Sequence, residues 1–161
     1  MVGKRLRIPV LLWLRLVRDL RRRGAGHRES GAFILGIRGK ASDIARTYIC
    51  YDDLDPEALD RGIVVIHGTG YAALWVHCRN RGLEVLADVH THPGELPRQS
   101  ETDRLNPMIS EAGHLAFILP RFGLTRRWTF QEVALYEYIN DYRWREWTEP
   151  TRKDRVKLVW W

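Results

Sequence analysis

Short apolar runs, separated by polar or glycine-containing segments, constrain the fold of this chain more than any other feature. Apolar runs of this length, bounded by turn residues, are typical of buried strands. We therefore expect a mixed α/β domain without an internal boundary, with a helix at 71–82, a turn or short helix at 52–62 and helical turns at 100–113. The segments predicted to form strands are 31–39 (GAFILGIRG), 44–51, 62–68 (GIVVIHG), 83–92 (LEVLADVHTH), 114–120 (HLAFILP), 129–138 and 156–161.

The N-terminal region predicts an amphipathic helix. Apolar residues from Val10 to Leu20 recur at helical spacing, and Gly24 supplies the stop. Charged residues interrupt the apolar run, no small-residue cleavage site follows, and the run is too short to span a bilayer. The arginines at 21–23 could contact phosphate, but a solvated last turn that complements the helix dipole is the better interpretation.

The composition indicates one domain with a basic balance. The chain has 161 residues, and 26 basic against 20 acidic residues give a net charge of +6. This charge favours acidic partners and does not by itself indicate nucleic acid. Cys50 and Cys78 are far apart and flanked by apolar residues, which predicts buried free thiols in a reducing compartment. We expect a single domain over residues 1–161 in the cytoplasm.

The segment 87–107 (ADVHTHPGELPRQSETDRLNP) ends an apolar strand with side chains that can bind a metal ion. Side chains alternate along a strand, so His90 and His92 share one face, while Thr91 points away together with Val85, Ala87 and Val89. After Pro93 and Gly94 stop the strand, a loop return can bring Asp103 to the histidines. Two imidazoles and one carboxylate form the ligand set of a catalytic zinc site, in which the fourth position stays open.

These residues resemble a known family. The pattern His90-Thr91-His92-Pro93, followed by Ser100 and Asp103, resembles the JAMM motif of JAB/MPN-type zinc metalloproteases. That motif also needs an upstream glutamate after an N-terminal helix, and Glu29 occupies this place before the 31–39 strand. The resemblance covers roughly residues 10–140. One departure is mild: Ala32 stands where many members have a second glycine. Asp88 occupies a position that is acidic in some bacterial members and aromatic in many others.

The resemblance implies a fold and a site. The fold would be a single JAB/MPN-like domain, a curved mixed β-sheet flanked by an N-terminal helix and a central helix. One zinc ion per chain would be bound by the two histidines and the aspartate of the motif. Glu29 would take a proton from the attacking water and pass it to the leaving amine, and Ser100 would donate to the developing oxyanion. Asp88, on the face of His90, could support a ligand by hydrogen bonding, although an ordinary strand-end carboxylate is an equally good interpretation.

The implied activity is that of a zinc-dependent (iso)peptidase. Catalytic members of the family hydrolyse the bond after the C-terminal glycine of a ubiquitin-like protein, in deconjugation or precursor processing. The chain is similar to compact, stand-alone prokaryotic members that are encoded beside E1-like and E2-like enzymes, including those of antiphage conjugation systems. The expected partners are a ubiquitin-like protein or its conjugates and such enzymes, without a membrane or nucleic acid.

Two alternatives belong to other functional classes. RadC-like nucleic-acid-associated proteins share the metal core, but their motif typically reads H-N-H-P-S-G, whereas this chain has HTHPGE at 90–95. A non-catalytic MPN scaffold usually lacks one or more of the ligands that are present here.

Several other residues have simpler expectations. His27, His67 and His114 are expected to be packed or solvated. Ser100 has a structural alternative, in which its hydroxyl caps the following turn. Trp160 and Trp161 are expected to close a sheet or an interface, because exposing them would be costly.

Overall fold

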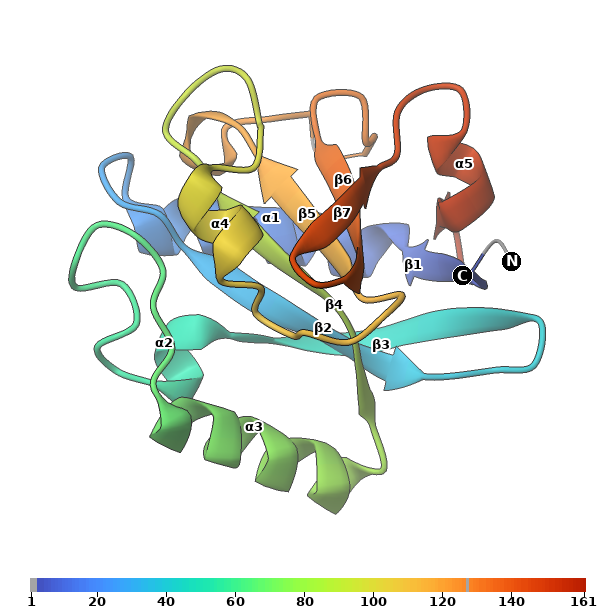
Figure 1. Ribbon diagram of the computed structural model, residues 1–161, viewed down its shortest axis with the longest axis horizontal. Helices are drawn as coiled ribbons and strands as arrows, with labels where there is room; N and C mark the ends of the chain where they lie inside the picture. The colour runs from blue at the N-terminus through green and yellow to red at the C-terminus, as the bar shows by residue number, and fades with distance from the viewer. Residues whose placement is uncertain (1–2, 127) are drawn as a thin grey trace.

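One mixed β-sheet runs through the molecule, with helices on both of its faces (Figure 1). The computed structural model describes residues 3–126 and 128–161. Within these residues the strand order is β7-β6-β5-β4-β2-β3-β1-β8. The strands are β1 (Arg5–Pro9), β2 (Gly31–Ile37), β3 (Ser42–Cys50), β4 (Glu84–Thr91), β5 (Leu115–Leu119), β6 (Ala134–Asn140), β7 (Arg143–Glu146) and β8 (Val156–Val159).

The sheet combines both kinds of pairing. β4 pairs in parallel with β5, and β1 pairs in parallel with both β3 and β8. The remaining pairs, β2 with β3 and β4, β5 with β6, and β6 with β7, are antiparallel. β4 therefore lies between β2 and β5, where both of its edges are hydrogen-bonded. The predicted curved mixed sheet of an α/β domain is confirmed.

Two cores, one on each face, hold the helices to the sheet. On one face α1 buries Trp13, Leu16 and Leu20 completely against residues such as Phe117. Burying a side chain of this size contributes about 1.5–3 kcal/mol. On the other face α2 and α3 pack around Phe33. No helix in the described part of the chain has the length and apolar character needed to cross a membrane. The helices are α1 (Val10–Gly24), α2 (Tyr51–Leu54), α3 (Gly68–Arg81), α4 (Glu101–Leu105) and α5 (Arg152–Arg155), with a 3₁₀ turn, η1, at Arg121–Gly123.

The two helices of at least three turns agree with the sequence predictions. α1 ends at Gly24 as expected, and α3 covers the predicted 71–82 helix but begins earlier, at Gly68. Cys50 and Cys78 are buried and unpaired, as their apolar neighbours predicted.

A β-bulge changes the predicted faces of β4. The register against β2 shifts between Ala87 and Val85, so Leu86 is an extra residue on β4. Leu86 joins the α1 core with Ala87 and Val89, whereas Val85 packs in the α2/α3 core. The expectation that Val85 shares a face with Ala87 is therefore wrong, because a bulge breaks the strict alternation of a strand.

The segment 62–68 does not form the predicted strand. Its backbone bonds locally instead: the Val65 amide donates to the Ala58 carbonyl at 2.9 Å, and the His67 amide donates to Asp55 Oδ2 at 2.9 Å. Both edges of β2, β3 and β4 are already paired, so an apolar segment beside them has no edge to join.

The ends of the sheet also differ from the sequence predictions. β1 and β7 were not expected, because charged residues alternate with apolar ones in RLRIP and outnumber them in RWRE. β6 begins at Ala134 rather than at 129. Trp160 and Trp161 follow β8 and are 86% and 60% exposed, so they do not close the sheet within this chain.

Candidate metal centre

β4 ends at the candidate metal centre, and its backbone is held on both sides there. The Thr91 amide donates to the Ser30 carbonyl, and the His92 amide donates to the Leu119 carbonyl, each at 2.9 Å. Thr91 turns into the interior, where its Oγ1 accepts from the Ser30 amide at 2.9 Å. Because side chains alternate, His90 and His92 project together from the opposite face of the sheet.

Asp103 reaches these histidines from the first turn of α4. The Asp103 amide donates to Ser100 Oγ at 3.0 Å, and the Ser100 amide donates to Asp103 Oδ2 at 2.9 Å. This capping box satisfies two amides that a short helix would otherwise leave without a partner. It also sets the direction in which the Asp103 carboxylate points.

The three side chains bring their donor atoms to one point. Nε2 of His90 lies 3.0 Å from Nε2 of His92. Asp103 Oδ1 lies 3.4 Å from His90 Nε2, and Asp103 Oδ2 lies 3.0 Å from His92 Nε2. Ligands bound to a tetrahedral zinc at about 2.0–2.1 Å lie roughly 3.3 Å from one another. The donor set and its spacing therefore fit one zinc ion. We call His90, His92 and Asp103 the metal cluster.

Burial and charge oppose each other in the metal cluster. Burial by itself lowers the pKa of His90, but the nearby carboxylates of Asp103 and Asp88 outweigh it and raise this pKa to about 10. Burial raises the pKa of Asp103, yet its bonds with His90 and His92 hold this pKa well below its ordinary value. Without a metal ion the cluster thus holds a proton, and a metal ion has to displace that proton to bind.

Glu29 lies in the loop between α1 and β2, within electrostatic reach of the metal cluster. Its amide donates to the Gly62 carbonyl at 2.8 Å. Burial raises the pKa of Glu29, while the nearby charges of His90 and His92 oppose that shift. A carboxyl group whose pKa is raised holds a proton more readily than an ordinary carboxylate does.

Ser100 is the N-cap residue of α4. Its hydroxyl oxygen accepts from the Asp103 amide, so the capping interpretation of this residue is correct. The hydroxyl hydrogen is not used by this bond and remains able to donate to another acceptor.

Asp88 is buried two residues before His90, and it has a partner that the sequence predictions missed. His114 Nε2 donates to Asp88 Oδ2 at 2.6 Å, while Asp88 Oδ1 lies 3.8 Å from His90 Nδ1. Burial raises the pKa of Asp88, but the bonds with His114 and His90 outweigh it and lower this pKa. The available signal was the place of His114 directly before β5, which pairs with β4 so that Ala87 faces Leu115.

Tyr51, in α2, lies near Asp88, and no sequence signal singled it out. Its ring packs over Gly31, where a Cβ atom would lie 2.2 Å from Tyr51 Cε2. Any other residue at position 31 would push the ring away. The Tyr51 hydroxyl is buried without a hydrogen-bond partner among the described residues. Burial, and then the charge of Asp88, raise the pKa of Tyr51.

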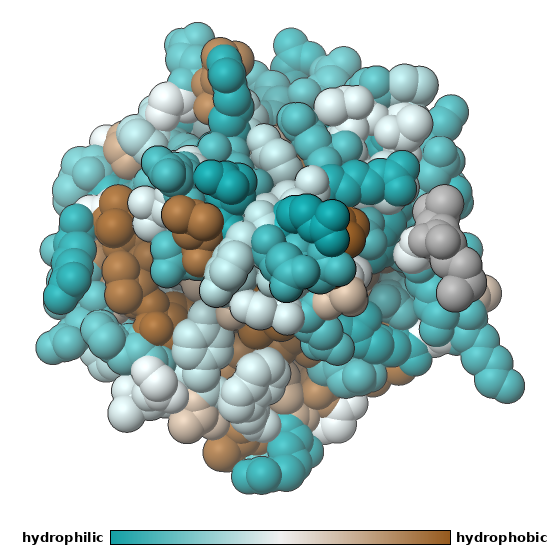
Figure 2. Space-filling view, in the orientation of Figure 1, coloured by the Kyte–Doolittle hydropathy of each residue, from teal (hydrophilic) through white to brown (hydrophobic). Residues whose placement is uncertain are grey.

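A groove of about 480 Å³ adjoins the metal cluster. One wall is the segment 63–66, and the other comprises α4 and the residues that follow it. In Figure 2 apolar side chains gather on the side of this face where these two segments lie. The residues that line the groove are Ile63, Val64, Val65, Ile66, Tyr71, Thr102, Leu105, Asn106, Pro107, Met108, Ser110 and Tyr142.

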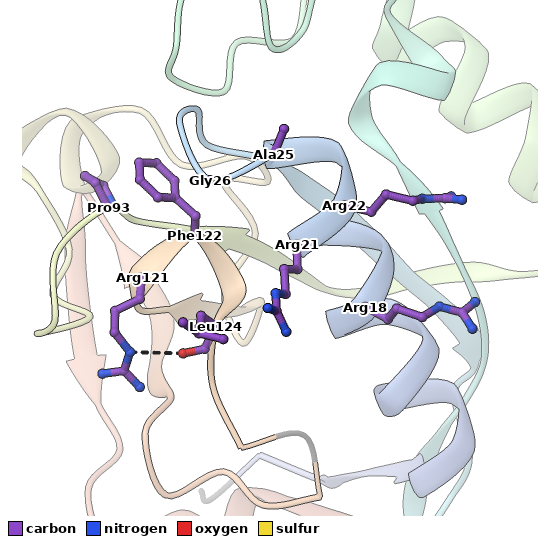
Figure 3. A pocket seen from close by; sticks show the side chains of 9 residues that line it. All are labelled: Arg18, Arg21, Arg22, Ala25, Gly26, Pro93, Arg121, Phe122 and Leu124. Carbon is purple, nitrogen blue, oxygen red and sulfur yellow. Dashed lines mark hydrogen bonds between the residues drawn. The ribbon is translucent and has the colours of Figure 1, made fainter.

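A larger hollow, of about 680 Å³, lies where the end of α1 meets the turn at 121–124 (Figure 3). Arg21 extends from α1 toward Leu124, whereas Arg18 and Arg22 point to the other side of the helix. These guanidinium groups do not converge, in keeping with solvated arginines. Arg23 differs from this prediction, because it forms ion pairs with Asp52 at 2.8 Å and Asp53 at 3.0 Å.

The fold and the metal cluster together define a JAB/MPN-like domain with a candidate metal site. The family model described as prokaryotic homologs of the JAB domain (Prok-JAB) matches residues 11–148. The chain therefore belongs to the prokaryotic JAB family.

Solved structures share this fold at low sequence identity. Protein DSY2949 from Desulfitobacterium hafniense matches with a TM-score of 0.64 and 13% identity, over 96% of this chain and 92% of the other. A protein from Salinibacter ruber matches with a TM-score of 0.53 and 14% identity, over 92% and 93% of the two chains. AF2198, a JAB1/MPN domain protein from Archaeoglobus fulgidus, matches with a TM-score of 0.50 and 15% identity, over 96% of this chain and all of the other. At these identities the likeness concerns the fold alone.

Proposed function

We propose that this protein is a zinc-dependent (iso)peptidase that hydrolyses the bond after the C-terminal glycine of a ubiquitin-like protein. The observation that carries the proposal is the convergence of His90, His92 and Asp103, with Glu29 beside them, in a chain of the prokaryotic JAB family. When bound by the metal cluster, zinc supplies Lewis-acid polarisation of the scissile carbonyl and activation of a water molecule.

Glu29 carries the proton transfers in this proposal. Its carboxylate takes a proton from the attacking water, whose oxygen forms a bond to the carbonyl carbon. The same carboxyl group then gives the proton to the nitrogen as the C–N bond breaks, so that a carboxylic acid and an amine leave the site and ionise to a carboxylate and an ammonium group. The raised pKa of Glu29 supports this double role, because the group must hold the proton between the two steps.

Ser100 stabilises the oxyanion in this mechanism. Its hydroxyl hydrogen, which the capping bond leaves free, would donate to the carbonyl oxygen as negative charge develops there. Losing one such donor costs about 10²–10³ in rate.

The groove beside the metal cluster supports a narrow, extended substrate. Among the described residues, the carbonyl groups of 63–66 accept no backbone hydrogen bond, although the Val65 amide donates to the Ala58 carbonyl. An extended tail can donate its amides to such free carbonyl groups, and small residues near the scissile bond permit a close approach. A C-terminal Gly-Gly tail meets both conditions. The net charge of +6 favours an acidic surface on the rest of the substrate.

The cellular setting follows from the same proposal. A deconjugating or processing enzyme of this kind would act with E1-like and E2-like enzymes in a prokaryotic conjugation system, such as those that defend against phages. The conjugated or precursor form of the ubiquitin-like protein would be its substrate.

The test measures metal content and cleavage together. Wild type is expected to contain about one zinc per chain and to cleave a ubiquitin-like fusion after its terminal glycine. His92→Ala should lose both, whereas Glu29→Gln should keep the zinc and lose about 10²–10⁴ in rate. His67→Ala, which removes an exposed histidine outside the metal cluster, is the matched control and should retain both. A wild type that binds no zinc when it is supplied would refute the proposal and favour the scaffold alternative.

A further inference from the structure

The buried pair Asp88–His114 is not needed to close the sheet or to complete the ligand set. Both side chains are 2% exposed, in the interior beneath the metal cluster. A buried ionised carboxylate is costly unless it is paired, and a hydrophobic residue at either position would avoid that cost. The retention of two buried polar groups next to a ligand calls for a specific function.

The Asp88–His114 pair lies next to His90, one of the three residues of the metal cluster. Asp88 Oδ2 accepts from His114 Nε2 at 2.6 Å, so this oxygen is already committed. Asp88 Oδ1 faces His90 Nδ1 at 3.8 Å, and that ring nitrogen is buried without a hydrogen-bond partner among the described residues. The other ring nitrogen, His90 Nε2, belongs to the metal cluster. The two nitrogens of His90 therefore face a carboxylate on one side and the cluster on the other.

An imidazole that binds a metal through one nitrogen carries its proton on the other. The acceptor for that proton sets the tautomer and the ring orientation. Asp88 Oδ1 offers an acceptor 3.8 Å from His90 Nδ1, while the hydrogen bond from His114 holds the other oxygen of the carboxylate. Tyr71 on α3 also lies near enough for the charge of Asp88 to affect it.

We propose that His114 and Asp88 are positioning residues, which hold His90 in the tautomer and orientation that present Nε2 to the metal. This inference rests on the proposed metal centre. It extends that centre to His114, which lies 26 positions after Asp88 in the sequence. The role differs from that of a ligand, because the side chains whose donor atoms converge are His90, His92 and Asp103, and neither Asp88 nor His114 is among them.

The first experiment reads the tautomer directly in the wild-type protein. Long-range ¹H–¹⁵N NMR spectra of the zinc-loaded protein should place the His90 proton on Nδ1, and Asp88→Asn should broaden or shift that signal. A proton found on Nε2 in the wild type would overturn the proposal without any variant.

The second experiment measures Co²⁺ and Zn²⁺ affinity in matched variants. His114→Leu leaves Asp88 without its donor, and Asp88→Asn removes the charge, so each should weaken metal binding about 10–100-fold. His114→Gln keeps an N–H donor for Asp88 and should restore most of the affinity, which a merely structural role would not require. His67→Leu is the control: it breaks another histidine–aspartate pair, at 2.7 Å, outside the metal cluster.

The possible outcomes separate this inference from the proposed function. Weaker metal binding in Asp88→Asn and His114→Leu, with rescue by His114→Gln, supports the positioning role even if no peptide bond is ever cleaved. Folded variants that all bind metal within about twofold of wild type overturn it, even if the protein is an active peptidase. Should His114→Leu fail to fold, Asp88→Asn, His114→Gln and the wild-type tautomer decide the question.

Discussion

Two groups of histidines and carboxylates in this chain look alike by composition but differ in what their donor atoms already bind. The metal cluster and a second group, Asp55, Glu57 and His67, each bring possible ligand atoms within 4.8 Å of one another. In the second group Asp55 Oδ2 accepts from the His67 amide at 2.9 Å and lies 2.7 Å from His67 Nδ1, and Oδ1 accepts from the Glu57 amide at 3.1 Å. Both oxygens of the Asp55 carboxylate are thus already hydrogen-bonded within the loop that Asp55 and His67 close.

The metal cluster leaves its donors directed at one another. Nε2 of His90 and Nε2 of His92, two atoms of the same chemical type, lie 3.0 Å apart in a largely buried position. Among the ligand atoms of the metal cluster, Asp103 Oδ2 accepts a hydrogen bond from a backbone amide, that of Ser100. The comparison indicates that closeness of ligand types is a weak criterion for a metal site. Convergence of ligand atoms from three side chains on one point in a largely buried place is a stronger one.

The largest effect is expected from removing a ligand. Asp103→Asn should weaken zinc binding by more than about a hundredfold, because losing a ligand costs more than losing a residue that supports one. Glu57→Gln removes a carboxylate from the second group and should change zinc affinity by less than about twofold. Isothermal titration with zinc measures both, and equal losses in the two variants would contradict the distinction between the groups.

The next effect is the pH dependence of stability in protein stripped of metal by a chelator. The folded-state pKa of His90 is raised from 6.5 to about 10, so the proton binds the folded protein more tightly than the unfolded one. Its stabilisation is complete below about pH 6.5 and is lost as the pH rises toward 10. Unfolding in urea should therefore show a loss of about 4 kcal/mol between these values. Zinc affinity should rise over the same range, since ligation needs neutral imidazoles.

His90→Gln supplies the control for that pH dependence. It should flatten the loss of stability, whereas His67→Gln, in the second group, should leave it unchanged. A wild-type protein whose stability rises over this pH range would show that His90 is not the protonated group.

A moderate effect is expected from breaking the second group. Asp55→Ala leaves the amides of Glu57 and His67 without their acceptor, and unpaired amides destabilise a loop. Thermal unfolding should show a fall in Tm of several degrees with unchanged zinc content. A loss of zinc from Asp55→Ala would instead identify a second metal site.

The smallest effect on stability is expected at Ser100. Ser100→Ala removes the acceptor for the Asp103 amide and should cost about 1 kcal/mol in chemical unfolding. If Ser100 also stabilises the oxyanion, cleavage should fall by about 10²–10³, far more than the lost cap explains. Ser100→Thr keeps both the cap and the donor, and it should restore both properties. A loss of stability alone would leave Ser100 with only the capping role.

Local pattern was sufficient to predict much of the fold. Apolar periodicity gave α1, α3 and most strands, because each depends on neighbours a few residues away in sequence. It failed at 62–68, where an apolar run has strand composition but no free sheet edge to join. It also failed at β1 and β7, whose charged residues are tolerated because β1 pairs with β3 and β7 pairs with β6.

What the sequence alone determined is therefore local. Alternation along β4 put His90 and His92 on one face, and the spacing from Ser100 to Asp103 is that of a capping box. Only the tertiary structure decided what lies beside them. The pairing of β4 with β5 brings His114 to Asp88, Gly31 admits the Tyr51 ring, and the apolar segment 63–66 remains a groove wall. Periodicity reports which side of an element is buried, whereas contacts between distant polar groups depend on the register in which strands pair.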